Sequence, residues 1–150
     1  MAFFLAKIYN IPMKLTSPRQ RQGEYFEQLA CDYLQQHGLQ LVAKNWHCSA
    51  IGELDLVMLA PPIAPTLSPC LVFIEVRQRK PSRFGTALDS ITPTKRRKLL
   101  ATAQAFLQAH DEFAAHEMRF DVVSFDTTCP LDSARPATPE WVIAAFDAEY

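Results

Sequence analysis

The 150-residue sequence has no apolar run that approaches the length of a membrane-spanning helix. Residues 1–6 are apolar, but Lys7 interrupts them and no basic leader precedes them, so we do not expect a secretory signal. The four cysteines form no Cys-x-x-Cys pair, which argues against a zinc knuckle or a redox pair. We therefore expect free thiols in a reducing cytoplasm. The four histidines form no ligand-type pair within one helix, which argues against a histidine metal site.

The composition is that of one globular domain. Hydrophobic residues make up 49% of the chain and charged residues 21%, which is enough to fill a core and unlike a disordered protein. We expect residues 1–18 to form an N-terminal extension and residues 19–150 to form the domain.

Hydrophobic periodicity predicts the helices and strands. Apolar residues at helical spacing predict a helix over residues 19–36, which Gly38 ends. Thr92 and Pro93, a cap followed by proline, begin a second helix that runs to about His110. Apolar runs and alternations predict strands over residues 39–43, 52–59, 71–79, 120–125 and 141–146. Four prolines between residues 60 and 69 exclude a central strand there and predict a hairpin loop.

The order of these elements predicts an α/β fold. A hairpin can join the second and third strands. The second helix is long enough to carry a crossover that places the fourth strand parallel to the third. We therefore expect a single domain with a mixed central sheet flanked by helices.

Two acidic residues lie inside apolar runs that otherwise predict buried strands. Leu54 and Leu56 flank Asp55, and Ile74 and Val76 flank Glu75. A buried carboxylate needs a partner, because an unpaired buried charge is very costly. A hard divalent cation between two neighbouring strands would supply one. A structural ion pair between Glu75 and a nearby arginine is the alternative.

The neighbours of these acids suit phosphate chemistry. Side chains alternate along a strand, so Glu75, Arg77 and Arg79 are expected on one face of the third strand. Mg²⁺ held by one or two carboxylates can polarise a phosphodiester and activate a water. The pattern therefore predicts a metal-dependent phosphodiesterase, provided that the strand register brings Asp55 near Glu75.

Charge is unevenly distributed along the chain. The formal net charge is only −1, yet residues 77–98 carry eight basic residues and one acid. Residues 111–150 carry nine acids and two arginines. A polarised protein of this kind can present a face that attracts phosphate, although a solvated helix surface would give the same pattern.

These motifs, taken as a set, resemble one bacterial family. The motifs are Gly23-Glu24, Gly52-Glu53-Leu54-Asp55-Leu56, Phe73-Ile74-Glu75-Val76-Arg77, Phe84-Gly85, Lys95 and Arg119-Phe120-Asp121-Val122-Val123. Over residues 19–125 they are similar to the YraN family, which resembles the PD-(D/E)xK endonuclease-like superfamily and archaeal Holliday-junction resolvases. The resemblance implies a restriction-endonuclease-like αβββαβ core.

The resemblance also implies roles for particular residues. Asp55 and Glu75 match the two metal-binding acids, and Glu24 matches an additional acid that such resolvases bring toward the metal. Arg77 stands where the superfamily usually has lysine. Arginine keeps the positive charge but stays protonated, so it cannot serve as a base. The implied cofactor is Mg²⁺ or Mn²⁺.

The implied partner is DNA, branched substrates included, with roles in repair or recombination. We expect the nucleic acid to contact Arg79, Lys80, Arg83 and Lys95. A homodimer is expected by analogy with resolvases, which cut two strands symmetrically. We interpret Asp121 as a structural partner of Arg119 or of a backbone group.

Two other functions stay open at the level of sequence. The chain could be a nuclease fold with feeble or lost activity that still binds nucleic acid, which the arginine at position 77 suggests. It could also be a scaffold that binds no nucleic acid, in which the acids and bases only pair with one another.

Overall fold

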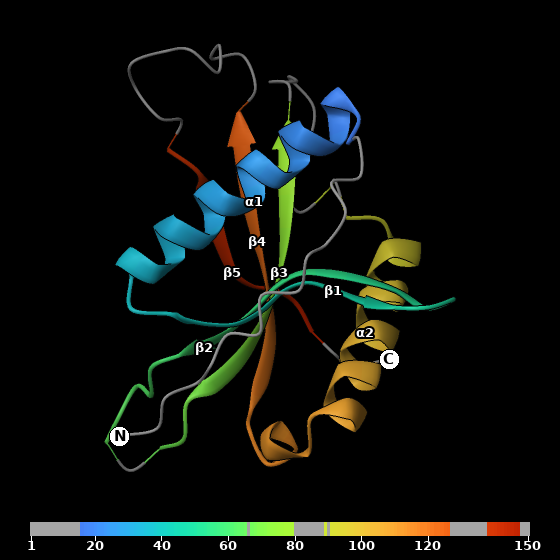
Figure 1. Ribbon diagram of the computed structural model, residues 1–150. Helices are drawn as coiled ribbons and strands as arrows, with labels where there is room; N and C mark the ends of the chain where they lie inside the picture. Colours follow the sequence, from blue (N-terminus) through green and yellow to red (C-terminus); the bar gives the residue numbers. More distant parts are fainter. Residues whose placement is uncertain (1–15, 66, 80–88, 90, 127–137, 148–150) are drawn as a thin grey trace, which may run out of the picture.

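The computed structural model describes residues 16–65, 67–79, 89, 91–126 and 138–147. Its elements are α1 (Pro18–Gln36), β1 (Gln40–Cys48), β2 (Gly52–Ala60), β3 (Cys70–Arg79), α2 (Pro93–Ala109), a short 3-10 helix (Asp111–Phe113), β4 (Met118–Asp126) and β5 (Glu140–Phe146). The strands form one sheet in the order β1-β2-β3-β4-β5 (Figure 1). None of the described helices is both long enough and apolar enough to span a membrane.

Helix α1 begins and ends where its sequence provides capping groups. The Ser17 hydroxyl accepts the backbone N–H of Gln20, and the Gln20 side chain accepts the backbone N–H of Ser17. This reciprocal pair satisfies two N–H groups that the first helical turn leaves open. At the other end Gly38 has φ of 89°, a left-handed conformation that glycine adopts at little cost.

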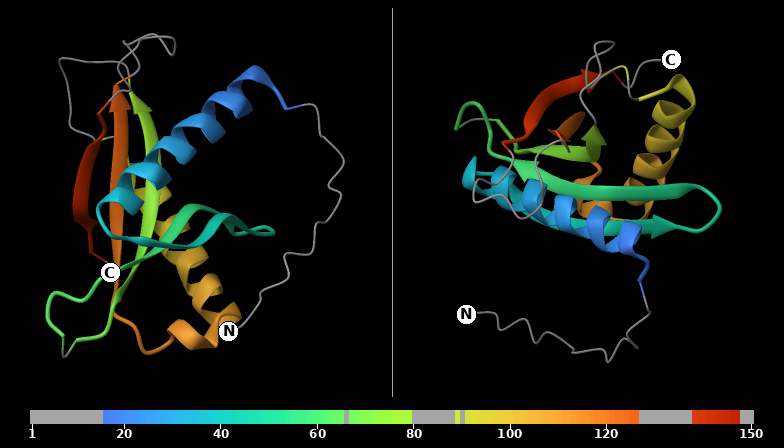
Figure 2. Two further views of the ribbon diagram at one scale, coloured as in Figure 1. Left: turned by 60° about the vertical axis from the view of Figure 1, so that its left-hand side comes forward. Right: turned by 90° about the horizontal axis from the view of Figure 1, so that it is seen from above.

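The two helices cover opposite faces of the sheet (Figures 1 and 2). Helix α1 packs on what we call the α1-side core, which includes Phe26, Leu34, Leu56, Ile74 and Phe125. Helix α2 packs on the α2-side core, which includes Leu54, Phe73, Leu99, Phe106 and Val122. The side chains of both cores are almost fully buried, so the central strands are apolar on both faces.

The fold agrees with the expected one. β2 and β3 are antiparallel and joined by the proline-bearing loop, and β3 and β4 are parallel with α2 in the crossover. This order is that of an αβββαβ core of the restriction-endonuclease type, with β5 added at the edge. The first strand is longer than residues 39–43, because it continues through Lys44, Asn45 and Trp46 to Cys48. Asn45 has φ of 50° and breaks the alternation from which the strand was predicted.

Strands β2 and β3 separate part-way along their length. Their ladder runs from Ala60 and Cys70 to Leu56 and Ile74. Beyond that point β2 stays paired with β1 as far as Gly52, while β3 stays paired with β4 as far as Arg79. Figure 1 shows the β1–β2 hairpin turning away from β3 and across α2. We call this opening between the two strands the fork.

The packing of β2 changes face at the fork. Leu54 belongs to the α2-side core and Leu56 to the α1-side core, although residues two apart usually share one strand face. Asp55 lies between them, so the strand twists at the residue that was predicted to bind metal.

Gly52 allows the start of β2 to approach α2. A Cβ placed at this position would lie 2.7 Å from Thr102 Oγ1, and that hydroxyl is fixed because it donates to the Lys98 carbonyl oxygen at 2.7 Å. We expect Gly52→Ala to lower the free energy of unfolding by about 1–3 kcal/mol, the usual cost of overpacking. Urea denaturation measures the change. Adding Thr102→Ala removes the hydroxyl that the new Cβ would meet, so the double variant should recover part of the lost stability. If the effects of the two substitutions on the free energy of unfolding simply add, the contact with Thr102 is not the cause.

Candidate active site

Asp55 connects the two strands of the fork through its side chain. Its Oδ2 accepts the backbone N–H of Val76 at 2.8 Å. Val76 lies just past the end of the β2–β3 ladder, so the carboxylate takes the place of a missing strand partner. This bond fixes the orientation of Asp55 and places it beside Glu75, the residue that precedes Val76.

Glu75 is a buried acid with only one of its two oxygens paired. The residue is 4% exposed. Its Oε1 lies 3.1 Å from Lys95 Nζ and 3.6 Å from Arg77 Nε. Its Oε2 is buried and has no hydrogen-bond partner in the described part of the chain. Buried polar atoms without a partner are rare and require an explanation.

The charge of Glu75 acts on Asp55. Burial and the charge of Glu75 raise the pKa of Asp55 to about 7, against the opposing effect of the Val76 N–H. The charges of Glu27 and Lys95 have smaller, opposite effects on the same pKa. A carboxyl that holds its proton near neutral pH, next to the buried carboxylate of Glu75, can exchange that proton for a cation.

The raised pKa predicts how stability depends on pH. Between the ordinary pKa of 3.8 and the folded value of about 7, the folded chain holds a proton on Asp55 that the unfolded chain has lost. The contribution of Asp55 to stability is therefore present below pH 4 and is lost as pH rises to about 8. Between pH 5 and pH 8 the expected loss is roughly 3 kcal/mol. Urea denaturation in EDTA at pH 5 and pH 8 tests it, with Asp55→Asn as control, and equal pH dependence in both proteins would contradict it.

The structure brings together some of the residues singled out in the sequence. Asp55, Glu75, Arg77 and Lys95 gather at the fork, and Lys95 reaches it from the first turn of α2. Arg79 lies at the end of β3, further along the same strand. Lys80 and Arg83 lie outside the described residues.

Helix α1 brings Glu27, an acid that the sequence analysis did not single out, close enough to act on Asp55. Glu24, the expected additional acid, is exposed. Glu27 is half-buried, and its Oε2 is buried without a hydrogen-bond partner among the described residues. Burial raises the pKa of Glu27, while its hydrogen bond to Asn45 and the charge of Lys44 lower it. The helical rotation of about 100° per residue places Glu27 beside the stripe of Phe26 and Ala30, a signal that could have identified it.

The acids at the fork fit a cation that needs few protein ligands. The described residues contain no cluster of three or more His, Cys, Asp or Glu side chains able to hold a metal ion. That argues against a metal held entirely by protein ligands, such as structural zinc. Mg²⁺ commonly takes one or two carboxylates and keeps several waters, which matches Asp55 with the unpartnered Oε2 of Glu75.

Comparison with known proteins gives the family. Residues 26–125 match the sequence profile of the uncharacterised protein family UPF0102, which is the YraN family. The chain belongs to the YraN family. A UPF0102 protein of Psychrobacter arcticus is 45% identical over 152 residues, covering 91% of this chain and 86% of the relative. One from Pseudomonas fluorescens is 43% identical over 134 residues, covering 89% and 99%. One from Nitrosococcus oceani is 43% identical over 128 residues, covering 85% and 93%.

The matched region of this YraN family member contains the whole fork. It begins at Phe26 in α1 and ends at Phe125 in β4, so Asp55, Glu75 and Lys95 all lie within it. The resemblance stated from the sequence motifs is confirmed, and with it the place of the family in the nuclease-like superfamily.

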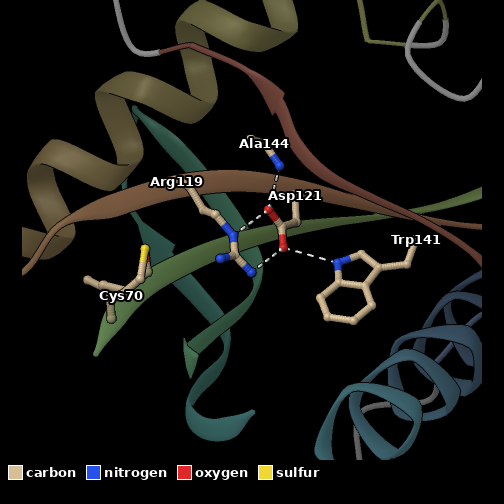
Figure 3. A network of polar contacts seen from close by, with 6 residues as sticks. Cys70, Arg119, Asp121, Trp141 and Ala144 are labelled. Carbon is tan, nitrogen blue, oxygen red and sulfur yellow. Dashed lines mark hydrogen bonds and ion pairs between the residues drawn. The ribbon is translucent and has the colours of Figure 1, made fainter. Parts of the chain in front are cut away.

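A second polar cluster of this YraN family member is structural. Asp121 is buried between β4 and β5, where its carboxylate accepts Arg119 Nε at 2.9 Å and an Arg119 terminal nitrogen at 3.1 Å (Figure 3). It also accepts Trp141 Nε1 at 3.0 Å and the Ala144 backbone N–H at 3.0 Å. Both interpretations of Asp121, as partner of Arg119 and of a backbone group, are confirmed. Its four bonds leave it no role as a metal ligand.

Proposed function

We propose that this protein is a divalent-metal-dependent endonuclease that hydrolyses phosphodiester bonds in structured or branched DNA. The observation that carries the proposal is the buried, unpartnered Oε2 of Glu75 next to an Asp55 whose pKa is raised to about 7. Membership of the nuclease-like superfamily supports it. The described cysteines, Cys31, Cys48 and Cys70, are free thiols, which suits a cytoplasmic protein.

Asp55 and Glu75 would hold the cation, which we propose to be Mg²⁺ or Mn²⁺. When bound, such an ion polarises the phosphodiester and lowers the pKa of a coordinated water. The Val76 N–H fixes the direction in which Asp55 presents its oxygens. Because this bond joins β2 to β3, it also sets how far the two acids stand apart.

The cations around the fork would receive the phosphate. Arg77 and Lys95 both reach Glu75 and are each about one third exposed at the side chain. Arginine can grip a phosphate with two donors, whereas lysine acts as a point charge. The exposed Arg97 extends the positive surface along α2. Branched DNA offers two equivalent strands, so we propose that a homodimer acts on it.

The test is cleavage by the purified protein. Labelled four-way junctions, flaps and linear duplexes are incubated with Mg²⁺, with Mn²⁺ or with EDTA, and the products are resolved on denaturing gels. We expect cleavage only with a divalent cation, and faster on branched substrates than on linear duplex. Absence of cleavage on every substrate with both cations would rule out the enzymatic proposal.

Arg77 favours a second candidate, a nucleic-acid-binding protein with feeble catalysis. In that case DNA affinity should fall steeply with salt, through loss of phosphate contacts, while cleavage stays undetected. Arg77→Lys separates the candidates. Cleavage that appears only in the lysine variant supports the binding protein, and equal cleavage by both proteins supports the enzyme.

A further inference from the structure

Lys95 lies where the helix itself does not favour a cation. It is the third residue of α2, and its backbone N–H donates to the Thr92 hydroxyl that caps the helix. The N-terminus of a helix carries partial positive charge, so acids stabilise this turn and cations do not. The contact that accounts for Lys95 lies across the fork, where its ammonium is 3.1 Å from Glu75 Oε1.

Lys95 also lies between the buried acid and solvent. Its side chain is 34% exposed, whereas that of Glu75 is 5% exposed. A lysine ammonium sits on a flexible four-carbon stem, so it can reach a different partner without movement of the helix. Because Lys95 is the more exposed member of the pair, an anion that arrives from solvent can contact its ammonium while Glu75 stays buried.

Glu75 does not depend on Lys95 alone for compensation of its charge. Arg77 Nε lies 3.6 Å from the same oxygen, two residues further along β3. Leaving a buried carboxylate uncompensated would be strongly unfavourable. With a second cation already in place, Lys95 can leave at a much smaller cost.

Binding of a metal would change the charges at the fork in a way that favours movement of Lys95 away from Glu75. Without a metal, the buried carboxylate of Glu75 faces the cations of both Lys95 and Arg77. A divalent cation held by Asp55 and Glu75 would compensate the carboxylate charge that Lys95 and Arg77 otherwise face. Lys95 and Arg77 then face like charge, so at least one of them gains by moving to an anion.

We propose that Lys95 is an exchangeable counter-ion, which pairs with Glu75 in the free protein and moves to a phosphate oxygen of bound DNA when a divalent cation binds at Glu75. The proposal rests on the proposed function, because it needs both the cation and the phosphodiester. It assigns to a residue of α2 the phosphate contact nearest the metal, while Arg77 keeps its Nε beside Glu75 and offers only its terminal nitrogens to the phosphate.

The first test measures Mn²⁺ affinity without DNA, by titration calorimetry, for wild type, Lys95→Met, Lys95→Arg and Lys98→Met. Methionine keeps a long unbranched side chain but removes the competing charge. We expect Lys95→Met to bind Mn²⁺ about five- to tenfold more tightly than wild type, because a like charge no longer opposes the ion. Lys95→Arg retains the charge and should stay within about twofold. Lys98→Met removes an equal charge from an exposed position one turn along α2, and should also stay within about twofold.

The second test measures DNA affinity by fluorescence anisotropy, in EDTA and in Ca²⁺. In EDTA, Lys95 is engaged with Glu75, so we expect wild type and Lys95→Met to differ by less than about twofold. In Ca²⁺ the wild type should bind about fivefold or more tightly than the variant, because Lys95 is then released to phosphate. A lysine that contacts DNA at all times would instead lose affinity equally in both conditions.

The outcomes separate this inference from the proposed function. Tighter Mn²⁺ binding by Lys95→Met, with a DNA defect confined to Ca²⁺, supports the exchange. Weaker Mn²⁺ binding by the same variant overturns it, because Lys95 would then only hold Glu75 in position. If wild type binds Mn²⁺ but cleaves nothing, the enzymatic function fails while the affinity tests still decide the role of Lys95. If neither protein binds Mn²⁺, both proposals fail.

Discussion

Asp55→Asn is expected to abolish metal-dependent cleavage without unfolding the protein. The substitution removes one of two carboxylates proposed to hold the cation, while the amide oxygen can still accept the Val76 N–H. We expect the single-turnover rate with Mn²⁺ to fall about a thousandfold, equivalent to roughly 4 kcal/mol of transition-state stabilisation. Because the asparagine is neutral at every pH, the variant should be more stable than wild type in EDTA at pH 8.

Glu53→Gln provides a matched control for this experiment. Glu53 lies two residues before Asp55 on β2, is exposed, and its carboxylate lies 3.8 Å from His47 Nδ1. Its neutralisation changes net charge by the same amount as Asp55→Asn, and we expect near wild-type cleavage. Retention of cleavage by Asp55→Asn would show that the fork is not the metal site. Loss of cleavage by both variants would point to a general effect of charge on DNA binding.

Asp121→Ala is expected to produce the largest loss of stability. The side chain of Asp121 is fully buried and accepts hydrogen bonds from a guanidinium group, an indole and a backbone amide. Removing it leaves Arg119 without its partner and Trp141 Nε1 without an acceptor. Breaking a buried pair in this way costs about 3–5 kcal/mol. Urea denaturation measures the loss.

The geometry of β5 gives a second reason to expect a large loss of stability in Asp121→Ala. The β4–β5 register shifts between Phe120 and Val122, so β5 bulges opposite Asp121, and Ala144 within the bulge has φ of 50°. The Asp121 carboxylate receives the amide that the bulge leaves without a ladder partner. Glu140→Ala, which removes an exposed acid from the same strand, should change stability by about 0.5 kcal/mol or less. A loss of similar size in both variants would contradict a special role for Asp121.

Local signals made most of the fold predictable. The Thr92-Pro93 start of α2 and the glycine that ends α1 act over a few residues, so the sequence reveals them directly. The apolar runs predicted all five strands, because both faces of the central strands are buried. The exception was the second half of β1, where the positive φ of Asn45 interrupts the alternation.

The candidate site was less predictable, because it depends on distant segments meeting. The strands that carry Asp55 and Glu75 are joined by a long loop. Such a loop does not fix the register of the two strands in the way that a two-residue hairpin turn does. The approach of Lys95 to Glu75 follows from how α2 docks on the sheet across the crossover, and no local pattern encodes that. The apolar stripe of α1 could have identified Glu27 as a half-buried acid, but its effect on Asp55 depends on how the helix docks on the sheet.

The proline-bearing connection between β2 and β3 makes a practical tool possible. It leaves the sheet at Ala60 and returns at Cys70, five residues along each strand from Asp55 and Glu75. At about 3.3 Å per residue, that separation is roughly 17 Å. Ile63 in this connection is 98% exposed. A short epitope or a fluorescent tag inserted there would lie away from the fork, and would allow immobilisation of the protein through the far end of these two strands.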